Sequence, residues 1–580
     1  MRSDSTDPDS TDPASTDSDS TDNGTSDRHE LTGGEALAGQ LEREGIRQIF
    51  GVPGVQLDHA IDGLARLDGT VAFWNTRHEQ AAAYMADGFA RAGGDIGTCM
   101  VVPGPGLLNA AAGLATAYAC SSRVLMICGQ LPSAGIGKGL GFLHEIPEQS
   151  RLLSSLTKWS ARAQSVTEVP ALVRRAVHEL RSGRPRPVGI EIPPDVLSHV
   201  APVSFIDVPA GDSQPLRPDA AAITAAVAAL RSCAAPVIYA GGGVTAAGAT
   251  RELQALAERL GAPVAMSRNG RGSLSDDHPL AMGPLGAAGL LSTSDLVLVV
   301  GSRFIGGNGK PPATAPGATV VLVNAEPADL GDPRTAAVSV LGDARLSLEA
   351  ILAELGEGKP AADRTDELAR LRQAGDDLLA PLEPQMSFVR AIREAIPDDG
   401  ILVNELTQVG YVAGLAYPVR RPGTFVTPGY QGTLGYGFPT ALGVKAASPD
   451  RAVVSITGDG GFGWSLQELA TARRYDIAAV VVVFNDGAFG NVRRTQKEQF
   501  GGRFLGTNLT NPDFVKLAEA FGVAGTRVDT PAALGGALRE AIAGNQPALI
   551  EVPMGECPSP WKLIHQPAPV SALPPSSPQT

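Results

Sequence analysis

The stretch VVSITGDGGFGWSLQELATARRYDIAAVVVVFNDGAFG, residues 453–490, decides the fold because it reads as one complete βαβ unit. An apolar run leads into the GDGG of residues 458–461, a helix is expected from about Ser465, and a second apolar run ends at Asn485 and Asp486. In such a unit both strands end at the same edge of a parallel sheet, where open α/β folds bind ligands. We therefore expect the carboxylates of Asp459 and Asp486 to face a common space.

The residues around this pair favour a phosphate and a divalent cation. Glycines after Asp459 let backbone N–H groups approach a phosphate closely, and the start of a helix adds a favourable dipole. Two carboxylates beside a phosphate repel each other and the ligand unless a hard cation lies between them, and Mg²⁺ prefers such oxygen ligands. The alternative is two turn aspartates that only cap their loops, and their pairing across one unit argues against it.

The same alternation of apolar runs and helical patterns extends through the chain from Leu31, as is typical of parallel α/β sheets. Two shifts in composition divide it: a Pro/Gly/Asp/Ser-rich passage after IEIPPDV, and a helix-rich stretch over residues 346–380. We predict an α/β fold of three doubly wound parallel-sheet domains, at residues 31–198, 210–358 and 383–556. Two domains with a long insertion are the alternative.

Composition excludes several classes of function. The net charge of -14, without a basic stripe, argues against nucleic acid as a partner, and no apolar run is long enough for a membrane-spanning helix. Five scattered cysteines without CxxC spacing indicate neither a disulfide framework nor zinc, so we expect a cytoplasmic protein. Residues 1–30, where STD recurs every five residues, are predicted to form a disordered acidic tail.

A GDG motif followed 27 positions later (486 minus 459) by a polar strand end resembles the pattern of thiamine diphosphate (ThDP) enzymes. The resemblance is to acetolactate synthase-like members, the superfamily of acetohydroxyacid synthase large subunits and 2-oxo acid decarboxylases, and it covers residues 31–556. It implies that Asp459, Asp486 and the backbone carbonyl of Ala488 hold Mg²⁺. The family usually has Asn where this chain has Asp486, which still offers a hard oxygen and adds a charge.

Glu79 lies in TRHEQAAAYMADGFAR, residues 76–91, where a strand is expected to turn into a helix. The resemblance implies that Glu79 is catalytic: it hydrogen-bonds N1′ of the aminopyrimidine and so promotes loss of the C2 proton of the thiazolium. Such a proton transfer needs a carboxylate in a pocket that excludes water. Without the family, Glu79 is better explained as a helix N-terminal charge that the helix dipole favours.

Four further stretches resemble the family in order and spacing: FGVPG (50–54), VPGPGLLN (102–109), NELTQVG (404–410) and PGYQGTLGYGFPTALG (428–443). The resemblance implies that Leu434 is an apolar wedge that bends the cofactor, and that the Gly432 carbonyl accepts from the cofactor's amino group. Leu434 in an ordinary core is the alternative. The implied cofactor-binding residues are Pro53, Glu79, Asn109, Leu406, Thr407, Gln408, Gly432, Leu434, Gly458, Asp459, Gly460, Gly461 and Asp486.

The loop GFLHEIPEQ, residues 141–149, departs from the family pattern. Acetolactate synthases have an aromatic residue followed by Gln-Glu, whereas this chain has Leu143, His144 and Glu145. A histidine near the reactive carbon is able to donate to a developing oxyanion or to shuttle a proton, so His144 is our second candidate catalytic residue. A loop histidine satisfied by its neighbours is the alternative.

The middle segments APVIYAGGGV and DLVLVVGSRF resemble the central domain that holds FAD in acetolactate synthases. The segment between GPLG and SDLVLVVGSRF is shorter than in flavin-binding members, and IGGNGK replaces an Asp pair that often follows RF. FAD and an empty or adenine nucleotide-binding domain therefore stay open. A coenzyme A-dependent member would need a basic pocket for the CoA phosphates, and the sequence does not locate one.

The resemblance implies a ThDP- and Mg²⁺-dependent enzyme that decarboxylates a 2-oxo acid and transfers the acyl-anion equivalent to a carbonyl acceptor. A simple decarboxylase that releases an aldehyde is the first alternative, and His144 favours it. A catalytically inactive ThDP-binding regulator is the second. Because the family builds each active site from two subunits, a homodimer or homotetramer is implied, whereas neither the 2-oxo acid nor a regulatory subunit is identified.

Overall fold

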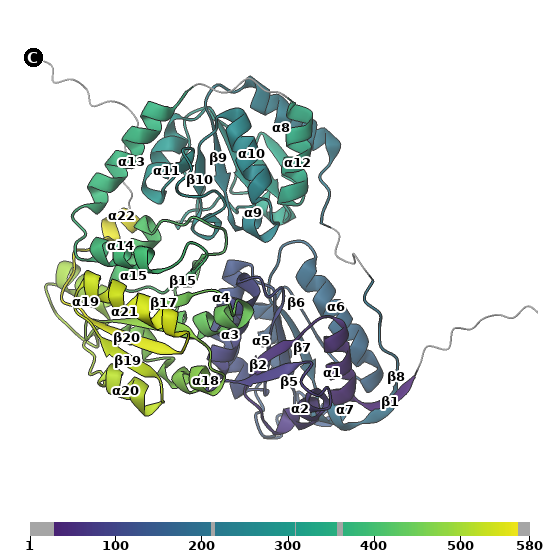
Figure 1. Ribbon diagram of the computed structural model, residues 1–580. Coiled ribbons are helices and arrows are strands. Elements are labelled where there is room, and N and C mark those ends of the chain that lie inside the picture. Colours follow the sequence, from purple (N-terminus) through teal and green to yellow (C-terminus); the bar gives the residue numbers. More distant parts are fainter. Residues whose placement is uncertain (1–27, 210–214, 308, 357–362, 566–580) are drawn as a thin grey trace, which may run out of the picture.

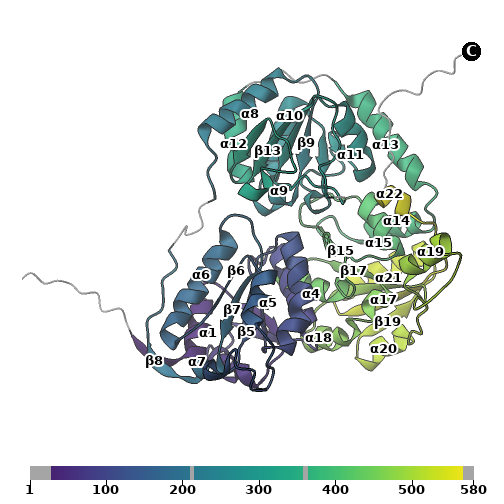
Figure 2. The ribbon, with the colours of Figure 1, turned by 180° about the vertical axis from the view of Figure 1, so that it is seen from behind.

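The computed structural model describes residues 28–209, 215–307, 309–356 and 363–565, which form three lobes (Figure 1). Each lobe is built on a six-stranded sheet in which every strand pair is parallel. The view from behind shows the same division, with the middle lobe above the other two (Figure 2). The predicted α/β fold with three parallel sheets is confirmed, and the alternative of two domains with an insertion is wrong.

The N-terminal lobe has the strand order β3-β2-β4-β5-β7-β6. Its strands are β2 (Gln48–Gly51), β3 (Ala72–Asn75), β4 (Gly97–Val101), β5 (Val124–Gly129), β6 (Trp159–Arg162) and β7 (Val188–Ile192). Its helices are α1 (Gly33–Arg43), η1 (Val55–Leu57), α2 (Asp58–Ala65), α3 (Glu79–Arg91), α4 (Pro105–Cys120), η2 (Ser133–Gly135), α5 (Gln149–Leu156), η3 (Val166–Glu168), α6 (Val169–Arg181) and α7 (Pro194–Ser198).

A short antiparallel pair joins the two ends of this lobe: β1 (His29–Thr32) with β8 (Val200–Val203). The predicted acidic tail ended at residue 30, and this is corrected because His29 and Glu30 belong to β1. The remainder of that tail, residues 1–27, lies outside the described residues.

The C-terminal lobe has the order β16-β15-β17-β18-β20-β19, which is the N-terminal order again when each sheet is numbered from its own first strand. Its strands are β15 (Ile401–Asn404), β16 (Phe425–Val426), β17 (Val453–Gly458), β18 (Ala479–Asn485), β19 (Ala524–Arg527) and β20 (Ala548–Pro553). Its helices are α14 (Gln385–Ala395), α15 (Gln408–Ala416), α16 (Gly437–Ala447), α17 (Asp459–Phe462), η6 (Leu466–Glu468), α18 (Leu469–Arg474), α19 (Gly490–Gln499), α20 (Phe514–Ala520), α21 (Pro531–Gly544) and α22 (Trp561–His565).

The middle lobe has the order β11-β10-β9-β12-β13-β14, the 3-2-1-4-5-6 arrangement of the Rossmann fold. Its strands are β9 (Pro236–Ala240), β10 (Val264–Met266), β11 (Ala281–Met282), β12 (Leu296–Val300), β13 (Thr319–Asn324) and β14 (Val338–Leu341). Its helices are α8 (Ala220–Ser232), α9 (Gly242–Ala246), α10 (Thr250–Leu260), η4 (Arg268–Gly270), α11 (Pro284–Thr293), η5 (Pro327–Asp329), α12 (Ala344–Leu355) and α13 (Thr365–Leu379).

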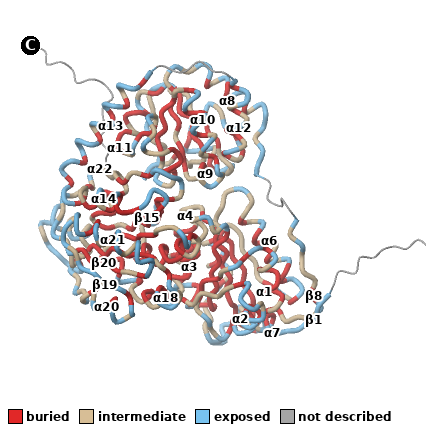
Figure 3. Tube along the Cα trace, viewed as in Figure 1, coloured by how far each residue is buried: buried red, intermediate tan, exposed pale blue. Residues whose placement is uncertain are grey.

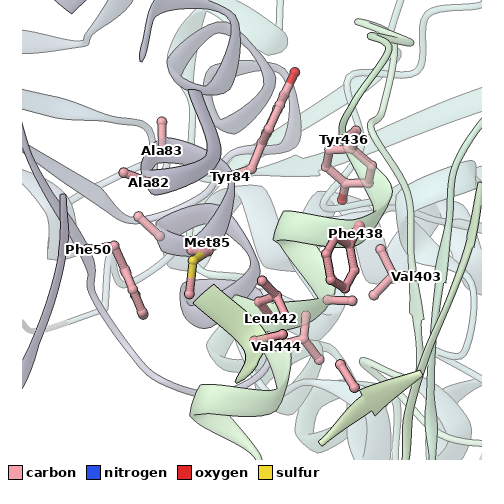
Figure 4. Close-up of a cluster of buried hydrophobic side chains, with 14 of the residues drawn as sticks. Phe50, Ala82, Ala83, Tyr84, Met85, Val403, Tyr436, Phe438, Leu442 and Val444 are labelled. Carbon is pink, nitrogen blue, oxygen red and sulfur yellow. The ribbon is translucent and has the colours of Figure 1, made fainter. Parts of the chain in front are cut away.

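Buried residues concentrate in the sheets and in the contact between the N- and C-terminal lobes (Figure 3). At that contact α3 packs along α16, and one hydrophobic cluster continues from Phe50 and Met85 to Phe438 and Leu442 (Figure 4). The helices are able to approach this closely because Gly443 has no side chain. A Cβ at this position would lie only 1.9 Å from the Met85 oxygen. The two lobes of one chain therefore share a core.

The helix expected from Ser465 begins at Leu466 as η6 and continues as α18, but the single turn α17 precedes it and was not predicted. The chain turns helical directly at Asp459 and breaks after Phe462 around Gly463. No helix within the described ranges is both long and apolar enough to cross a membrane.

Candidate active site

Two carboxylates lie side by side at the carboxyl ends of neighbouring strands in the C-terminal lobe. Asp459 follows β17 and Asp486 follows β18, and these strands pair with Gly458 opposite Phe484. Asp459 is only 3% exposed and Asp486 is partly buried. Burial, and then the neighbouring charge of Asp459, hold the pKa of the Asp486 carboxyl above its usual range. Such a pair of like charges is stabilised when a cation lies between the two carboxylates.

Amide groups orient the two carboxylates. Asn511 Nδ2 donates to Asp459 Oδ2 at 2.6 Å, and Gln408 Nε2 donates to Asp486 Oδ2 at 3.3 Å. The Ala488 N–H donates to Asp486 Oδ1 at 3.2 Å. A Cβ on Gly490 would lie 2.3 Å from Asp486 Oδ2, so a side chain there would displace this carboxylate. Gln408 was predicted to contact the cofactor, whereas Asn511 was missed because it lies in a loop with no motif of its own.

The donor set fits Mg²⁺. Within the described residues, no cluster of three or more His, Cys, Asp or Glu side chains is arranged to hold a metal. The site instead offers two carboxylates and the backbone at Ala488, which is held by an isolated bridge to Asn508. Mg²⁺ is commonly bound by one or two carboxylates and completes its shell with phosphate or water oxygens, whereas structural zinc requires four protein ligands.

The predicted diphosphate loops lie next to each other at the end of β15 and β17, where the strand order reverses. Thr407 is the residue before α15, and a Cβ on Gly458 would lie 3.5 Å from its Oγ1. Leu406, which precedes it, is half-buried. At Gly460 a Cβ would lie 2.8 Å from the Phe489 ring. Ligands of open α/β sheets bind at this kind of crevice.

Glu405 joins these loops and was not predicted. Its buried carboxylate accepts from the N–H groups of Gly435 at 3.0 Å and Gly437 at 2.8 Å, and from Thr457 Oγ1 at 2.9 Å. A Cβ on Gly461 would lie 2.2 Å from Glu405 Oε1, so the GDGG turn closes directly over this carboxylate. Burial raises the pKa of Glu405 to about 7.

Leu434 lies in the loop that Glu405 anchors, and 37% of its surface is exposed. An apolar side chain that is exposed on a fixed loop is not packed in an ordinary core, and its role as a wedge stays a prediction. Gly432, two residues earlier, adopts a φ of +57°, which favours glycine. Between them Thr433 Oγ1 lies 2.5 Å from the Tyr84 hydroxyl of α3.

The remaining predicted residues gather in the N-terminal lobe. Glu79 begins α3 directly after β3, and its Oε2 accepts from Asn109 Nδ2 of α4 at 2.9 Å. Pro53 lies in an exposed loop after β2. In the part of the chain that is described, no hydrogen bond or ion pair joins Glu79 to Asp459 or Asp486. The predicted residues thus form two groups, one on each lobe.

His144 belongs to the N-terminal group through Gln56, which the sequence analysis did not single out. His144 Nδ1 lies 3.1 Å from Gln56 Oε1. The His144 carbonyl packs against Gly104, where a Cβ would lie only 2.1 Å away. Gly104 precedes α4, so His144 lies near the helix that carries Asn109.

A cavity of about 540 Å³ lies between the middle and N-terminal lobes, away from the carboxylate pair. Its lining includes the Rossmann turn residues Gly242 and Gly301 and also reaches Tyr430, at the start of the Leu434 loop. Six arginines line it: Arg123, Arg181, Arg184, Arg268, Arg303 and Arg345. Four of them form ion pairs, Arg123 and Arg181 with Asp95, Arg184 with Asp329, and Arg345 with Glu349. The sequence did not locate this basic pocket, because its arginines come from separate segments of two lobes.

The chain matches three family models in succession. These are the N-terminal TPP binding domain of thiamine pyrophosphate enzymes over residues 31–152, their central domain over 223–351 and their C-terminal TPP binding domain over 406–552. The chain therefore belongs to the thiamine pyrophosphate, or ThDP-dependent, enzyme family.

Similar proteins place it in one part of that family. A probable acetolactate synthase large subunit of Methanocaldococcus jannaschii is 36% identical over 550 residues, 90% of this chain and 92% of that protein. A probable 2-ketoarginine decarboxylase of Pseudomonas aeruginosa is 37% identical over 506 residues, 85% and 89% of the two chains. The acetolactate synthase isozyme 3 large subunit of Escherichia coli is 32% identical over 535 residues, 88% and 92%. The chain is a ThDP-dependent enzyme of the acetolactate synthase or 2-oxo acid decarboxylase kind.

Proposed function

We propose that this enzyme, with ThDP and Mg²⁺, decarboxylates a 2-oxo acid and passes the acyl group to a carbonyl acceptor. The observation that carries the proposal is the Asp459–Asp486 pair beside the GDGG turn, at the crevice where the C-terminal sheet reverses its strand order. Bound ThDP supplies the nucleophilic carbon and the electron sink that decarboxylation requires.

In the C-terminal lobe, Asp459, Asp486 and the Ala488 carbonyl would hold Mg²⁺, which would supply positive charge to balance a diphosphate. The backbone of residues 458–461 and 406–408 contacts the diphosphate, since these loops meet at the crevice. Leu434 supports the bend of the cofactor from its anchored loop.

In the N-terminal lobe, Glu79 would exchange a proton with the pyrimidine ring of bound ThDP. Asn109 Nδ2 donates to one oxygen of the Glu79 carboxylate and so fixes its orientation. His144 acts on the substrate side, as a proton carrier or as a donor to a developing oxyanion.

A homodimer or homotetramer is part of this proposal, because each complete site needs both groups of residues. Within one chain Glu79 pairs with Asn109, while Asp459 and Asp486 are bound to Asn511 and Gln408. A second copy brings its C-terminal group to the N-terminal group of the first. The active sites then lie at the subunit interface.

A simple decarboxylase that releases an aldehyde is the second candidate. The specific observation that favours it is His144, held by Gln56 beside Gly104, since aldehyde release requires a proton to be delivered. The similarity to a protein described as a probable 2-ketoarginine decarboxylase supports the same candidate.

The test is to purify the enzyme, add ThDP and Mg²⁺, and screen a panel of 2-oxo acids for CO2 release. Each active acid is then incubated with and without aldehyde or 2-oxo acid acceptors. A condensed hydroxyketone product establishes the carboligase, and a free aldehyde in the presence of acceptors establishes the decarboxylase. No ThDP-dependent CO2 release from any acid would overturn both.

For the basic cavity we propose an anionic nucleotide ligand, with FAD and an adenine nucleotide as the two candidates. Its volume lies in the range of small-molecule sites, and Arg268 and Arg303, which form no ion pair within the described residues, offer charge to phosphates. The visible spectrum of the purified protein distinguishes them: absorbance near 450 nm means flavin, and a 260 nm excess without it means adenine. A coenzyme A-dependent reaction would use the same charges and is tested by adding CoA thioesters to the panel.

A cytoplasmic location agrees with five free cysteines.

A further inference from the structure

Gln56 makes two contacts with the loop that carries His144. It lies in η1 after β2 and is only 7% exposed. Its Nε2 donates to the Leu143 carbonyl oxygen at 3.2 Å, and its Oε1 lies 3.1 Å from His144 Nδ1. The side-chain amide thus contacts the backbone and the ring of two successive residues.

These contacts fix the tautomer of His144. A carbonyl oxygen only accepts hydrogen bonds, so the Gln56 atom facing Leu143 must be the NH2 group. The other end of the amide is then the oxygen, which also only accepts, and His144 Nδ1 must carry the hydrogen. In the neutral imidazole, Nε2 is therefore the nitrogen with the free lone pair.

The backbone of the loop is held as firmly as the ring. His144 has a φ of +70°, in the left-handed region that non-glycine residues rarely adopt. Its carbonyl lies against Gly104, whose own N–H donates to Gln149 Oε1 at 2.7 Å. Gln149 Nε2 in turn donates to the buried Glu191 at 2.8 Å. A strained residue persists where its surroundings determine it, and such positions concentrate at functional sites.

We propose that Gln56 is a positioning residue that holds His144 with hydrogen on Nδ1, so that Nε2 accepts a proton from water and delivers it to the substrate carbon. The inference rests on the proposed function. When a 2-oxo acid loses CO2 and leaves as an aldehyde, that carbon gains one proton in place of the carboxylate. His144 takes up this proton at Nε2 and returns to the neutral ring after each delivery, so no other reactant is needed.

The first test uses the protein without cofactor. The chain has eight histidines, so ¹⁵N-histidine-labelled wild type is compared with His144→Gln to assign the His144 signals. We expect a protonated Nδ1 and an unprotonated Nε2 at neutral pH. Gln56→Met, which keeps the side-chain length without the acceptor, is expected to give mixed tautomers, whereas Gln56→Glu keeps the Nδ1 hydrogen. Hydrogen on Nε2 in the wild type, or an unchanged spectrum in Gln56→Met, overturns the proposal.

The second test measures product formation with an acid that the panel identifies. Gln56→Met is expected to lower kcat for aldehyde release by about 10- to 100-fold, with KM and ThDP affinity unchanged, because proton delivery and not binding is impaired. Gln56→Glu, which keeps an acceptor for Nδ1 but loses the donor to the Leu143 carbonyl, should be less impaired than Gln56→Met. Gln254→Met, the same exchange at an exposed position of α10, is the control. A rise in KM with unchanged kcat in Gln56→Met contradicts the positioning role.

The two tests separate this inference from the proposed function. If no 2-oxo acid is decarboxylated by the wild type, the proposed function fails and the tautomer is still read from the spectrum. If the wild type is active and both Gln56 variants match it in kcat, the positioning role fails alone.

Discussion

Asp486 carries a charge where the family usually has none, and this charge faces Asp459. Without metal, the buried carboxylate of Asp459 and the partly buried carboxylate of Asp486 repel each other. Asp486→Asn is therefore expected to stabilise the metal-free protein at pH 7.5 by about 1 kcal/mol, and to shrink the rise in Tm on adding Mg²⁺. Thermal unfolding with and without Mg²⁺ checks both. A less stable metal-free variant, or a larger Mg²⁺ effect, would show that the second charge is not what the cation balances.

Glu79 is expected to be essential for turnover and dispensable for folding. Glu79→Gln keeps the size of the side chain and an oxygen for Asn109 but loses the titratable proton, so kcat should fall by roughly 10²- to 10⁴-fold while ThDP still binds. Steady-state rates and calorimetric ThDP titration measure the two properties. Glu252→Gln removes a carboxylate from the first turn of α10 and serves as the control, with full activity expected. A turnover of Glu79→Gln equal to that of the wild type would leave Glu79 as a helix-start charge only.

At the residue scale, the sequence predicts side chains that directly follow a buried strand, such as Asp459 and Asp486. Parallel strands bring their carboxyl ends together whatever lies between them. It does not predict Gln56, Glu405 or Asn511, because their partners come from loops that meet only in the folded chain: Gln56 and His144, for instance, are 88 residues apart.

At the element scale, side chains of the C-terminal lobe form hydrogen bonds with the loop that precedes Glu79. The Arg77 N–H donates to the two oxygens of Glu468 in η6 at 3.1 and 3.2 Å, and the Asn75 N–H donates to the Tyr475 hydroxyl at 2.8 Å. Thr471 Oγ1 also donates to Glu468, at 2.6 Å. The position of α3, and with it Glu79, thus depends on two side chains of the other lobe in the same chain.

Glu468→Ala is expected to destabilise the fold by about 1–3 kcal/mol, because it removes the acceptor of the Arg77 N–H and leaves the buried Thr471 hydroxyl without its partner. It should also lower kcat more than ThDP affinity, since the start of α3 loses its anchor. Denaturant unfolding and steady-state kinetics measure these changes. Unchanged kcat in a variant that has lost the expected stability would mean that the anchor serves folding alone.

The same carboxylate gives a pH test. Burial raises the pKa of Glu468 from 4.5 to about 7, so the folded state binds its proton more tightly than the unfolded state does. Its contribution is therefore largest below pH 4.5 and is lost as the pH rises towards 7. Glu468→Gln has no carboxyl group to titrate, so its unfolding free energy does not fall in this way. As the pH rises from 4.5 towards 7, the variant should therefore gain stability relative to the wild type. A constant difference would mean that Glu468 does not titrate there.

Elements also show what the sequence leaves undetermined. Apolar runs such as VVVV in β18 predict strands buried on both faces, and the structure has them there. The turn α17 was missed because four residues containing two glycines have weak helix propensity, and the turn forms where β17 ends and Gly461 packs closely against Glu405. The close crossing of α3 and α16 depends on Gly88 and Gly443 meeting backbone of the other helix, which no local pattern reveals.

At the scale of the molecule, the N- and C-terminal sheets share one strand order. Each lobe carries one of the two groups of predicted site residues, close to the point where the strand order of its sheet reverses. Within a chain these lobes meet through α3 and α16, which buries the flanks of the helices and leaves the two groups of site residues unjoined. Exposed apolar side chains remain beside each group, Leu108 and Leu143 on one and Leu434 and Trp464 on the other. We propose that these two faces meet in a symmetric pair of chains, in which each copy completes the site of the other.

Complementation between two inactive variants tests this arrangement. Glu79→Gln removes the N-terminal function and Asp459→Ala removes the metal ligand, so each homodimer is expected to be inactive. In a mixed dimer, the intact Glu79 of one chain meets the intact Asp459 of the other, which restores one of the two sites. After unfolding and refolding together at equal amounts, half of the dimers are mixed, so about a quarter of wild-type activity should return. If both groups served one site within each chain, every site would still carry a defect and no activity would return. Refolding each variant alone, under the same conditions, controls for the recovery of folded protein.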